Sequence, residues 1–359
     1  MKILRVVHLW VGLTVGGILF FTAFSGTVLV FKYDLLNLSL PDNAPLYRPP
    51  TLTEKSRAMT QLKNAQTRLI RFPSPGLNYY VHADQDTVQY YHPDSLQRVT
   101  GRYHIPLMLR VLSDLHIHLL AGKTGEKVLG FLGLGLLFLC LSGLVIWFPG
   151  RRGFRVRSSL PKKVSRGSFL ASHRSAGVLS CLMILLLTTT GVGMVFYDIS
   201  KDLIRGLIGE ESPASTAAAP VTIPPQRGDF RSWPEILQAV AQSLPGGRIT
   251  LYYAPKQVDN RIQKFRLRYD EDWTPNGASF IQVDPYSARA VAEIDYRTAP
   301  TSDRIARKLF PLHTGAIGGR SYQLIVALTG LFLMLMIGTA FGAWVKKKRQ
   351  AGRGGKCVK

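Results

Sequence analysis

Four long apolar segments constrain the fold of this chain more than any other feature. They cover residues 7–31, 128–149, 175–197 and 321–345, and none contains Asp, Glu, Lys or Arg. A helix needs about 20 residues to cross a hydrocarbon core of roughly 30 Å, and each segment is long enough. Four such segments are hard to shelter inside a soluble protein. The sequence therefore predicts a membrane α-helical protein with four transmembrane helices.

The net charge of +23 is explained by membrane topology and not by nucleic-acid binding. Lys and Arg are dense in residues 150–174 and 346–359, which contain no acidic residue, and all 22 acidic residues lie in 32–127 and 198–320. The positive-inside rule places the basic segments and both termini in the cytoplasm. We read the first apolar segment as an uncleaved anchor, because no small-residue cleavage site follows it. Membrane lipid is thus an expected partner, and nucleic acid is not.

The two segments on the outer side are too long for simple loops, and both have the pattern of small α+β units. Alternating strand-like runs are predicted at 68–72, 77–83, 87–92, 248–253, 262–269 and 278–283. Ser232 is a candidate N-cap for a helix with Pro234 in its first turn. Residues 213–225, rich in Pro, Ala, Ser and Thr, resemble a linker.

An internal comparison indicates that the chain contains two similar halves. An offset of 165 residues aligns the first apolar segment with the third and His8 with His173. An offset of 197 aligns the second with the fourth and His116 with His313. Paired segments then cross the membrane in the same direction, as in parallel repeats related by an axis along the membrane normal. Such an axis would bring the equivalent histidines to face each other.

Two facing histidine pairs suit two b-type haems, because haem iron accepts an imidazole on each axial side. The sequence has no C-x-x-C-H motif, so the haems would be held without covalent attachment. Three basic residues near these histidines are candidate partners for the haem propionates: Lys123, Arg174 and Arg320.

Other polar and aromatic residues have simpler interpretations, with some alternatives left open. His118 is an alternative or auxiliary ligand to His116, although its repeat position holds Gly315. We interpret the remaining histidines, at positions 82, 92 and 104, as surface residues. Neighbouring tyrosines at 79–80, 90–91 and 252–253 are expected to pack the sheets, or, where exposed, to bind a bulky and partly apolar ligand. The cysteines at 140, 181 and 357 do not form an extracellular disulfide framework.

Several stretches of the chain resemble the PepSY-associated transmembrane family, also called iron-regulated membrane proteins. The likeness rests on 8–31 with the following Phe-Lys-Tyr-Asp, on Leu-His at 115–116 through 151–152, on 173–198, and on Leu-His-Thr-Gly at 312–315 through 344. Residues 281–287 are similar to the closing strand and turn of a PepSY domain. The resemblance implies two PepSY-like periplasmic domains, a bacterial inner membrane and kinship with ferrioxamine-reductase-type siderophore reductases.

Together these observations predict a di-haem inner-membrane reductase. It would pass electrons from a cytoplasmic reductant or quinol to a periplasmic ferric siderophore and release Fe(II). The alternative is a membrane-anchored PepSY-type regulator or inhibitor of a secreted peptidase; a transporter would need broken helices and polar residues at the midplane. The expected boundaries are transmembrane helices at 1–31, 128–149, 175–197 and 321–345, outer domains at 32–127 and 198–320, a basic loop at 150–174 and a basic tail at 346–359.

Overall fold

A computed structural model describes residues 1–41, 45–99, 104–211, 229–255 and 261–354. The chain divides into two compact units. The helical unit contains Met1–Lys32, Leu107–Ser200 and Leu312–Lys359, and the sheet unit contains Tyr33–Pro106 and Lys201–Pro311.

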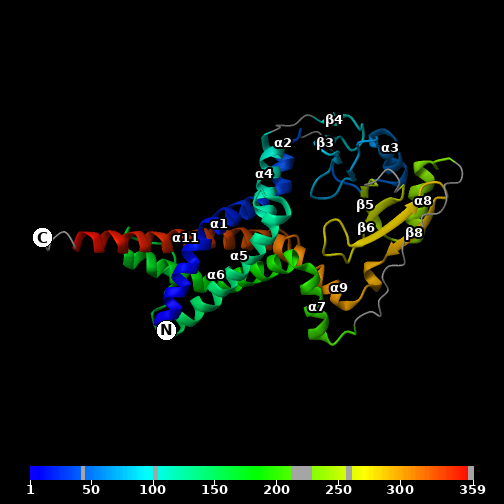
Figure 1. Cartoon of the computed structure of the whole chain (residues 1–359). Helices are drawn as coiled ribbons and strands as arrows, with labels where there is room; N and C mark the ends of the chain where they lie inside the picture. The colour runs from blue at the N-terminus through cyan, green and yellow to red at the C-terminus, as the bar shows by residue number, and fades with distance from the viewer. Residues whose placement is uncertain (42–44, 100–103, 212–228, 256–260, 355–359) are drawn as a thin grey trace. The chain divides into compact units, whose positions relative to one another are not determined.

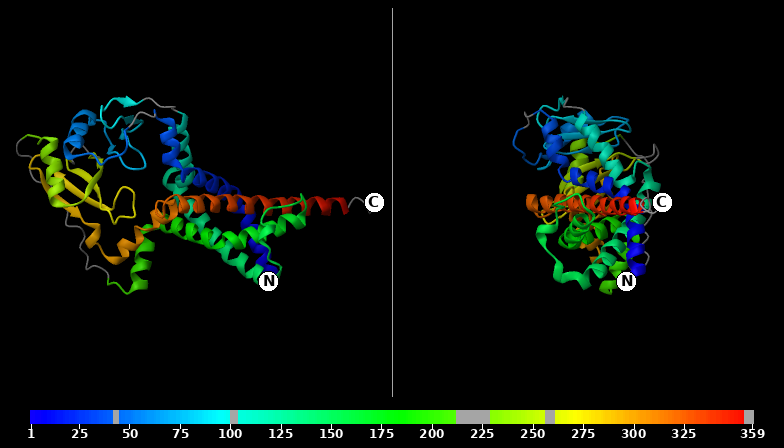
Figure 2. Two further views of the ribbon diagram at one scale, coloured as in Figure 1. Left: turned by 180° about the vertical axis from the view of Figure 1, so that it is seen from behind. Right: turned by 90° about the vertical axis from the view of Figure 1, so that its left-hand side faces the viewer.

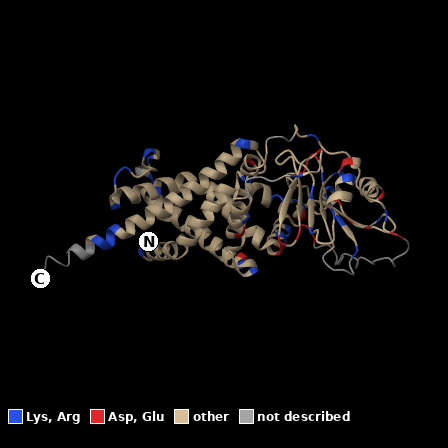
Figure 3. Ribbon diagram, turned by 90° about the horizontal axis from the view of Figure 1, so that it is seen from above, with Lys and Arg blue, Asp and Glu red and all other residues tan. Residues whose placement is uncertain are grey.

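Four long helices form the helical unit: α1 (Lys2–Leu29), α5 (Gly122–Trp147), α6 (Arg166–Val195) and α11 (Gly319–Gly354). All four are long and apolar enough to cross a membrane, which agrees with the prediction. α6 packs along α11 and α5, and α1 packs on α5 and α11 (Figures 1 and 2). Most helices extend beyond the charge-free segments, because Lys and Arg are good helix formers and their stems can lie along apolar surface. In Figure 3 the last described part of α11, next to the grey C-terminal segment, is blue, the colour of Lys and Arg.

The helical unit contains a buried apolar cluster. Leu19 of α1, Leu136 of α5 and Ile184 of α6 form a buried cluster, and Met336 and Ile337 of α11 pack against it. Each of the four helices therefore contributes to one core.

Two shorter helices lead into α5 and α11. α4 (His104–His118) precedes α5, and α10 (Leu309–Thr314) precedes α11. The chain turns between each short helix and the long helix that follows it through residues with positive φ. These are Leu119, Leu120 and Gly122 between α4 and α5, and Gly315, Gly318 and Gly319 between α10 and α11. These turns let a histidine near the end of each short helix point into the bundle.

The sheet unit contains one sheet of eight antiparallel strands in the order β4-β3-β2-β1-β5-β6-β7-β8. The strands are β1 (Leu69–Arg71), β2 (Tyr80–Ala83), β3 (Val88–Tyr91), β4 (Arg98–Val99), β5 (Arg248–Tyr253), β6 (Gln263–Arg268), β7 (Ser279–Asp284) and β8 (Arg289–Ile294). β1 pairs with β5, with Ile70 opposite Tyr252. The prediction of two separate outer domains is therefore wrong, because this pairing joins strands of both segments into one sheet.

Two helices cover one face of this sheet. α3 (Leu52–Leu62) and α8 (Trp233–Ser243) each begin with a capping box, formed by Thr51 with Glu54 and by Ser232 with Glu235. Their apolar sides pack against buried strand residues such as Tyr252. The predicted helix start at Ser232 is confirmed, whereas α3 was not predicted.

The remaining elements are short. They are α2 (Lys32–Ser39), α7 (Tyr197–Ile208), α9 (Thr301–Ala306), and the 3-10 turns η1 (Phe148–Gly153), η2 (Val156–Ser158) and η3 (Tyr296–Thr298). All six predicted strands are present, with β4 and β8 in addition. The predicted linker at 213–225 lies outside the described residues.

Candidate functional site

His116 of α4 and His313 of α10 face each other, with ring centroids 6.0 Å apart and planes at 49°. Nδ1 of His116 donates to the carbonyl oxygen of Thr22 on α1 at 2.9 Å. Nδ1 of His313 donates to the carbonyl oxygen of Leu187 on α6 at 2.8 Å. A carbonyl oxygen can only accept, so Nδ1 carries the proton in each neutral ring. The lone pair then lies on Nε2, which is the nitrogen free to bind a metal.

Hydroxyl groups accompany both of these contacts. Ser25 Oγ lies 3.4 Å from Nδ1 of His116, and Thr190 Oγ1 lies 3.2 Å from Nδ1 of His313. Thr22 and Leu187 are 165 residues apart in the sequence, and so are Ser25 and Thr190. The two rings thus have the same surroundings at positions that the internal comparison aligns.

Glycines on α1 and α6 make room for these rings. A Cβ added to Gly26 would lie 2.6 Å from Cε1 of His116, and one added to Gly191 would lie 3.1 Å from Cε1 of His313. Both distances are shorter than ordinary van der Waals contact. The glycines therefore allow each imidazole to lie directly against the neighbouring helix.

His8 of α1 and His173 of α6 form a second pair, with ring centroids 6.4 Å apart and planes at 84°. Nδ1 of His173 donates to the carbonyl oxygen of Met336 on α11 at 2.9 Å. Nδ1 of His8 shares a hydrogen bond of 2.8 Å with the hydroxyl of Ser142 on α5. A Cβ on Gly143 would lie 3.4 Å from Cε1 of His8, so this ring also lies close to a glycine.

The two pairs lie well apart along the helical unit. On α1, His8 and the Thr22 carbonyl are 14 residues apart, and on α6 the same interval separates His173 from the Leu187 carbonyl. At a rise of 1.5 Å per residue, this interval corresponds to roughly 21 Å along each helix. The apolar cluster around Leu19 lies on the helix segments between the two pairs.

The donor set of each pair suits an iron ion whose other ligands come from a macrocycle. Within the described residues, no group of three or more His, Cys, Asp or Glu side chains could hold a metal ion. Two imidazoles whose Nδ1 atoms already make hydrogen bonds could hold a haem iron through their Nε2 atoms.

The other predicted site residues are three basic side chains. Lys123, Arg174 and Arg320 are exposed. Arg174 Nε donates to the carbonyl of Leu170, and Arg320 Nη1 donates to Gln323 Oε1, each at 3.2 Å. Their role with haem propionates stays a prediction.

The remaining histidines have separate surroundings. His118 pairs with Asp114 on its own helix at 3.0 Å, and it is His116 that faces His313. His82 is buried at 3% exposure and shares a hydrogen bond with Thr67, so the prediction that it is a surface residue is wrong. His92 is half-buried, and His104 is exposed as predicted.

Sequence reasoning missed the acceptors that orient the rings. Backbone carbonyls leave no mark in a sequence, so the roles of Thr22 and Leu187 could not be predicted. The sequence signal for this environment is the match of Ser25 with Thr190 at the 165-residue offset.

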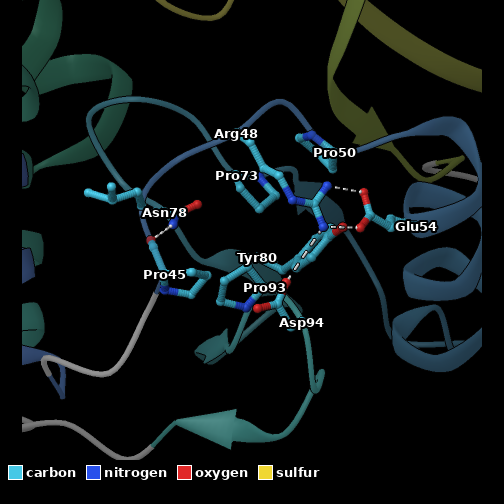
Figure 4. Close-up of a pocket in the computed structure, with 10 residues that line it drawn as sticks. Pro45, Arg48, Pro50, Glu54, Pro73, Asn78, Tyr80, Pro93 and Asp94 are labelled. Atoms are coloured by element: carbon cyan, nitrogen blue, oxygen red, sulfur yellow. Dashed lines mark hydrogen bonds and ion pairs between the residues drawn. The ribbon is translucent and has the colours of Figure 1, made fainter.

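The sheet unit has a small pocket lined by prolines at 45, 50, 73 and 93 and closed by Arg48, Glu54, Asn78, Tyr80 and Asp94 (Figure 4). Arg48 makes a two-fold ion pair with Glu54 and lies 3.9 Å from Asp94. Its charge is therefore satisfied locally, and we assign no chemistry to this pocket.

Comparison with known proteins identifies the family of the whole chain. None of the curated proteins that were compared matches it. A family model described as the PepSY-associated TM region matches residues 5–347. This match includes all four long helices, both histidine pairs and the sheet unit. The chain therefore belongs to the PepSY-associated TM region family.

Proposed function

We propose that this protein is a di-haem reductase of the bacterial inner membrane that reduces a ferric siderophore in the periplasm. Four residues would serve as axial ligands, His8 with His173 and His116 with His313. The observation that carries the proposal is the shared environment of His116 and His313. Each ring has its Nδ1 on a backbone carbonyl, a hydroxyl beside it and a glycine beneath it.

The hydrogen bonds at Nδ1 would orient these histidines as ligands, as such bonds do at metal sites generally. A hydrogen bond at Nδ1 fixes the tautomer and ring orientation and increases the electron donation of Nε2. When bound, each haem would accept and release one electron. The apolar helix interior around Leu19 and Ile184 would keep water away from the space between the two sites.

The chemistry of iron release explains why such a reductase needs no bond-breaking residue. Hard oxygen ligands hold Fe(III) tightly and hold the softer and less charged Fe(II) far less well. One electron per iron therefore converts a tight chelate into a weak one, and the chelator leaves intact. The electron donor would be a cytoplasmic reductant or a membrane quinol.

The test is to reduce the purified protein and add a ferric siderophore under anaerobic conditions with an Fe(II)-specific chromophore present. Wild-type protein should be reoxidised as the Fe(II) complex forms. His313→Ala should lose at least 90% of this activity, while the haem held by His8 and His173 remains reducible. The matched control, His104→Ala, changes an exposed histidine outside both pairs and should behave like wild type.

Failure with every ferric chelate, in protein that holds two haems, would contradict the siderophore-reductase proposal. The regulator alternative predicts no electron transfer at all and no effect of His313→Ala. A peptidase-inhibition assay with the full chain would then be the next experiment.

A further inference from the structure

The face of the sheet opposite α3 and α8 carries cationic and aromatic side chains, whereas the helix-covered face is the apolar core. Successive strand residues point to opposite faces, so the residues between core positions lie on this second face. They form a row across the strands in which Tyr90, Val81, Arg71, Leu251, Arg266 and Phe280 are consecutive cross-strand neighbours. At about 4.8 Å per strand, this row is roughly 24 Å long.

Cations and aromatic rings are paired at one side of the row. The guanidinium of Arg71 lies 4.7 Å from the ring centroid of Tyr33 and donates to its hydroxyl at 2.7 Å. A second hydrogen bond, to Ser74 Oγ at 2.8 Å, fixes the orientation of Arg71. Tyr90 is close enough to Arg71 for its pKa to respond: burial raises that pKa, and the positive charge of Arg71 opposes the rise.

A similar arrangement lies on β6 and β7. Lys264 Nζ is 4.6 Å and the Arg266 guanidinium 5.1 Å from the ring centroid of Phe280. Arg266 Nε donates to the carbonyl of Gly277 at 2.8 Å, which holds the guanidinium in place. Arg268, two residues further along the same side of β6, has a buried Nε without a hydrogen-bond partner among the described residues.

The strands contribute few acidic residues to this face. Among the described strand residues that alternate with the core positions, the only carboxylate is Asp284. It is 2% exposed and lies 3.5 Å from Arg261. Neither Arg71 nor Arg266 forms an ion pair with a described acidic residue. A surface of one sign raises the local concentration of ligands of the opposite sign.

Between the two clusters lies Leu251, the cross-strand neighbour of both Arg71 and Arg266. Leu251 is only 4% exposed, so a ligand would contact the half-buried arginines and rings on either side of it and not Leu251 itself. The two arginines are two strand spacings apart, or roughly 10 Å. A ligand that met both clusters would therefore be about this wide, negatively charged at its rim and partly aromatic.

We infer that this sheet face binds anionic, aromatic ferric chelates of the tris-catecholate class in preference to uncharged or cationic hydroxamates. Catecholate rings can pack on Tyr33, Tyr90 and Phe280, and the negative charge of the chelate complements Arg71 and Arg266. That the bound chelate is a substrate rests on the proposed reductase function. The binding itself does not, because it depends only on the charge and rings of this face.

The test uses the full chain in phosphatidylcholine nanodiscs and gallium(III) chelates, which have the shape and charge of the ferric ones but are not reduced. Isothermal titration should show at least tenfold tighter binding of gallium tris-catecholate than of gallium tris-hydroxamate. The double variant Arg71→Gln/Arg266→Gln should weaken tris-catecholate binding at least tenfold. A control with the same change of charge, Arg48→Gln/Arg231→Gln, alters exposed arginines elsewhere in the sheet unit and should bind like wild type.

Two further measurements keep the inference testable if the glutamine variant folds poorly. The charge-preserving Arg71→Lys/Arg266→Lys should retain most of the binding, and added salt should weaken wild-type binding of the tris-catecholate but not of the hydroxamate. Equal affinity for both chelates, or unchanged binding in the glutamine variant, would overturn the inference. It would also be overturned if the glutamine variant bound the tris-catecholate like wild type but its nanodiscs no longer bound phosphatidylglycerol vesicles. The face would then be a contact surface for lipid.

The outcomes separate this inference from the reductase proposal. If gallium tris-catecholate binds as described but no ferric chelate is reduced, the binding face stands and the reductase proposal is wrong. If ferric hydroxamates are reduced but gallium tris-catecholate does not bind, the reductase proposal stands and this inference is wrong.

Discussion

At the residue scale, the direction of each ring nitrogen distinguishes the paired histidines from His118. His116 has its Nδ1 on the Thr22 carbonyl and faces His313, whereas His118 points its Nδ1 at Asp114. His116→Ala should therefore remove one haem of two, and His118→Ala, its control two residues away, should remove none. Haem content measured by pyridine haemochrome, per mole of chain, checks this. If His118→Ala lost haem and His116→Ala did not, His118 would be the ligand in place of His116.

The glycines beneath the rings offer a second residue-scale test. Gly26→Ala would place a methyl group 2.6 Å from Cε1 of His116, so the ring must move from its position. We expect this variant to lose at least half of the haem at that pair or to show a changed low-spin spectrum. Gly17 is on the same helix, and a Cβ there meets no atom within 4 Å. Gly17→Ala should leave the spectrum unchanged, and equal spectra for both variants would contradict the packing argument.

The sequence predicted the histidine pairs but not what orients them. Matched histidines at two offsets indicated which side chains share a site, because side-chain identity is what a sequence records. His82 was misjudged for a related reason: strand alternation does not tell which of two faces is covered by helices.

At the element scale, α3 places a lysine where burial works against its charge. Lys55 is 6% exposed, and its pKa falls from an ordinary 10.5 to about 8, first because of burial and then because of Arg248, while Glu54 opposes the shift. The native state binds a proton there less readily than the unfolded chain. Burial of Lys55 therefore lowers the free energy of unfolding by about 3 kcal/mol below pH 8, and this loss declines as the pH rises toward 10.5.

Replacing this lysine should therefore stabilise the protein. Lys55→Met should raise the stability of the folded state by roughly 1–3 kcal/mol at pH 7, and its advantage over wild type should shrink between pH 8 and pH 10.5. Thermal unfolding of both proteins in detergent at several pH values checks this. A variant less stable than wild type at pH 7, or an advantage that does not change with pH, would contradict the argument.

The elements of the sheet were easier to predict than their pairing. Alternating apolar residues indicated β5, β6 and β7 within one or two residues of their observed bounds. The β1–β5 pairing joins strands far apart in the sequence, and no local pattern encodes such a contact. The sequence therefore suggested two units where the structure has one sheet.

At the scale of the whole molecule, the basic segments predict the orientation in the membrane. The loop at 150–174 and the tail after residue 345 should be cytoplasmic, and residues 33–106 and 201–311 periplasmic. A green fluorescent protein at the C-terminus should then be fluorescent. Alkaline phosphatase should be inactive at the C-terminus and active when fused after Glu211. The reverse pattern would place the sheet unit in the cytoplasm and remove its access to a periplasmic chelate.

The most direct measurement for the central proposal is the visible spectrum of the purified full chain, together with its haem content. If each histidine pair holds one haem, the protein should show a low-spin b-type spectrum, with haem that acid acetone extracts and a ratio near two per chain. The double variant His116→Ala/His313→Ala should retain one haem, held by His8 and His173. A colourless protein from haem-replete cells, or a ratio that these substitutions leave unchanged, would contradict the account.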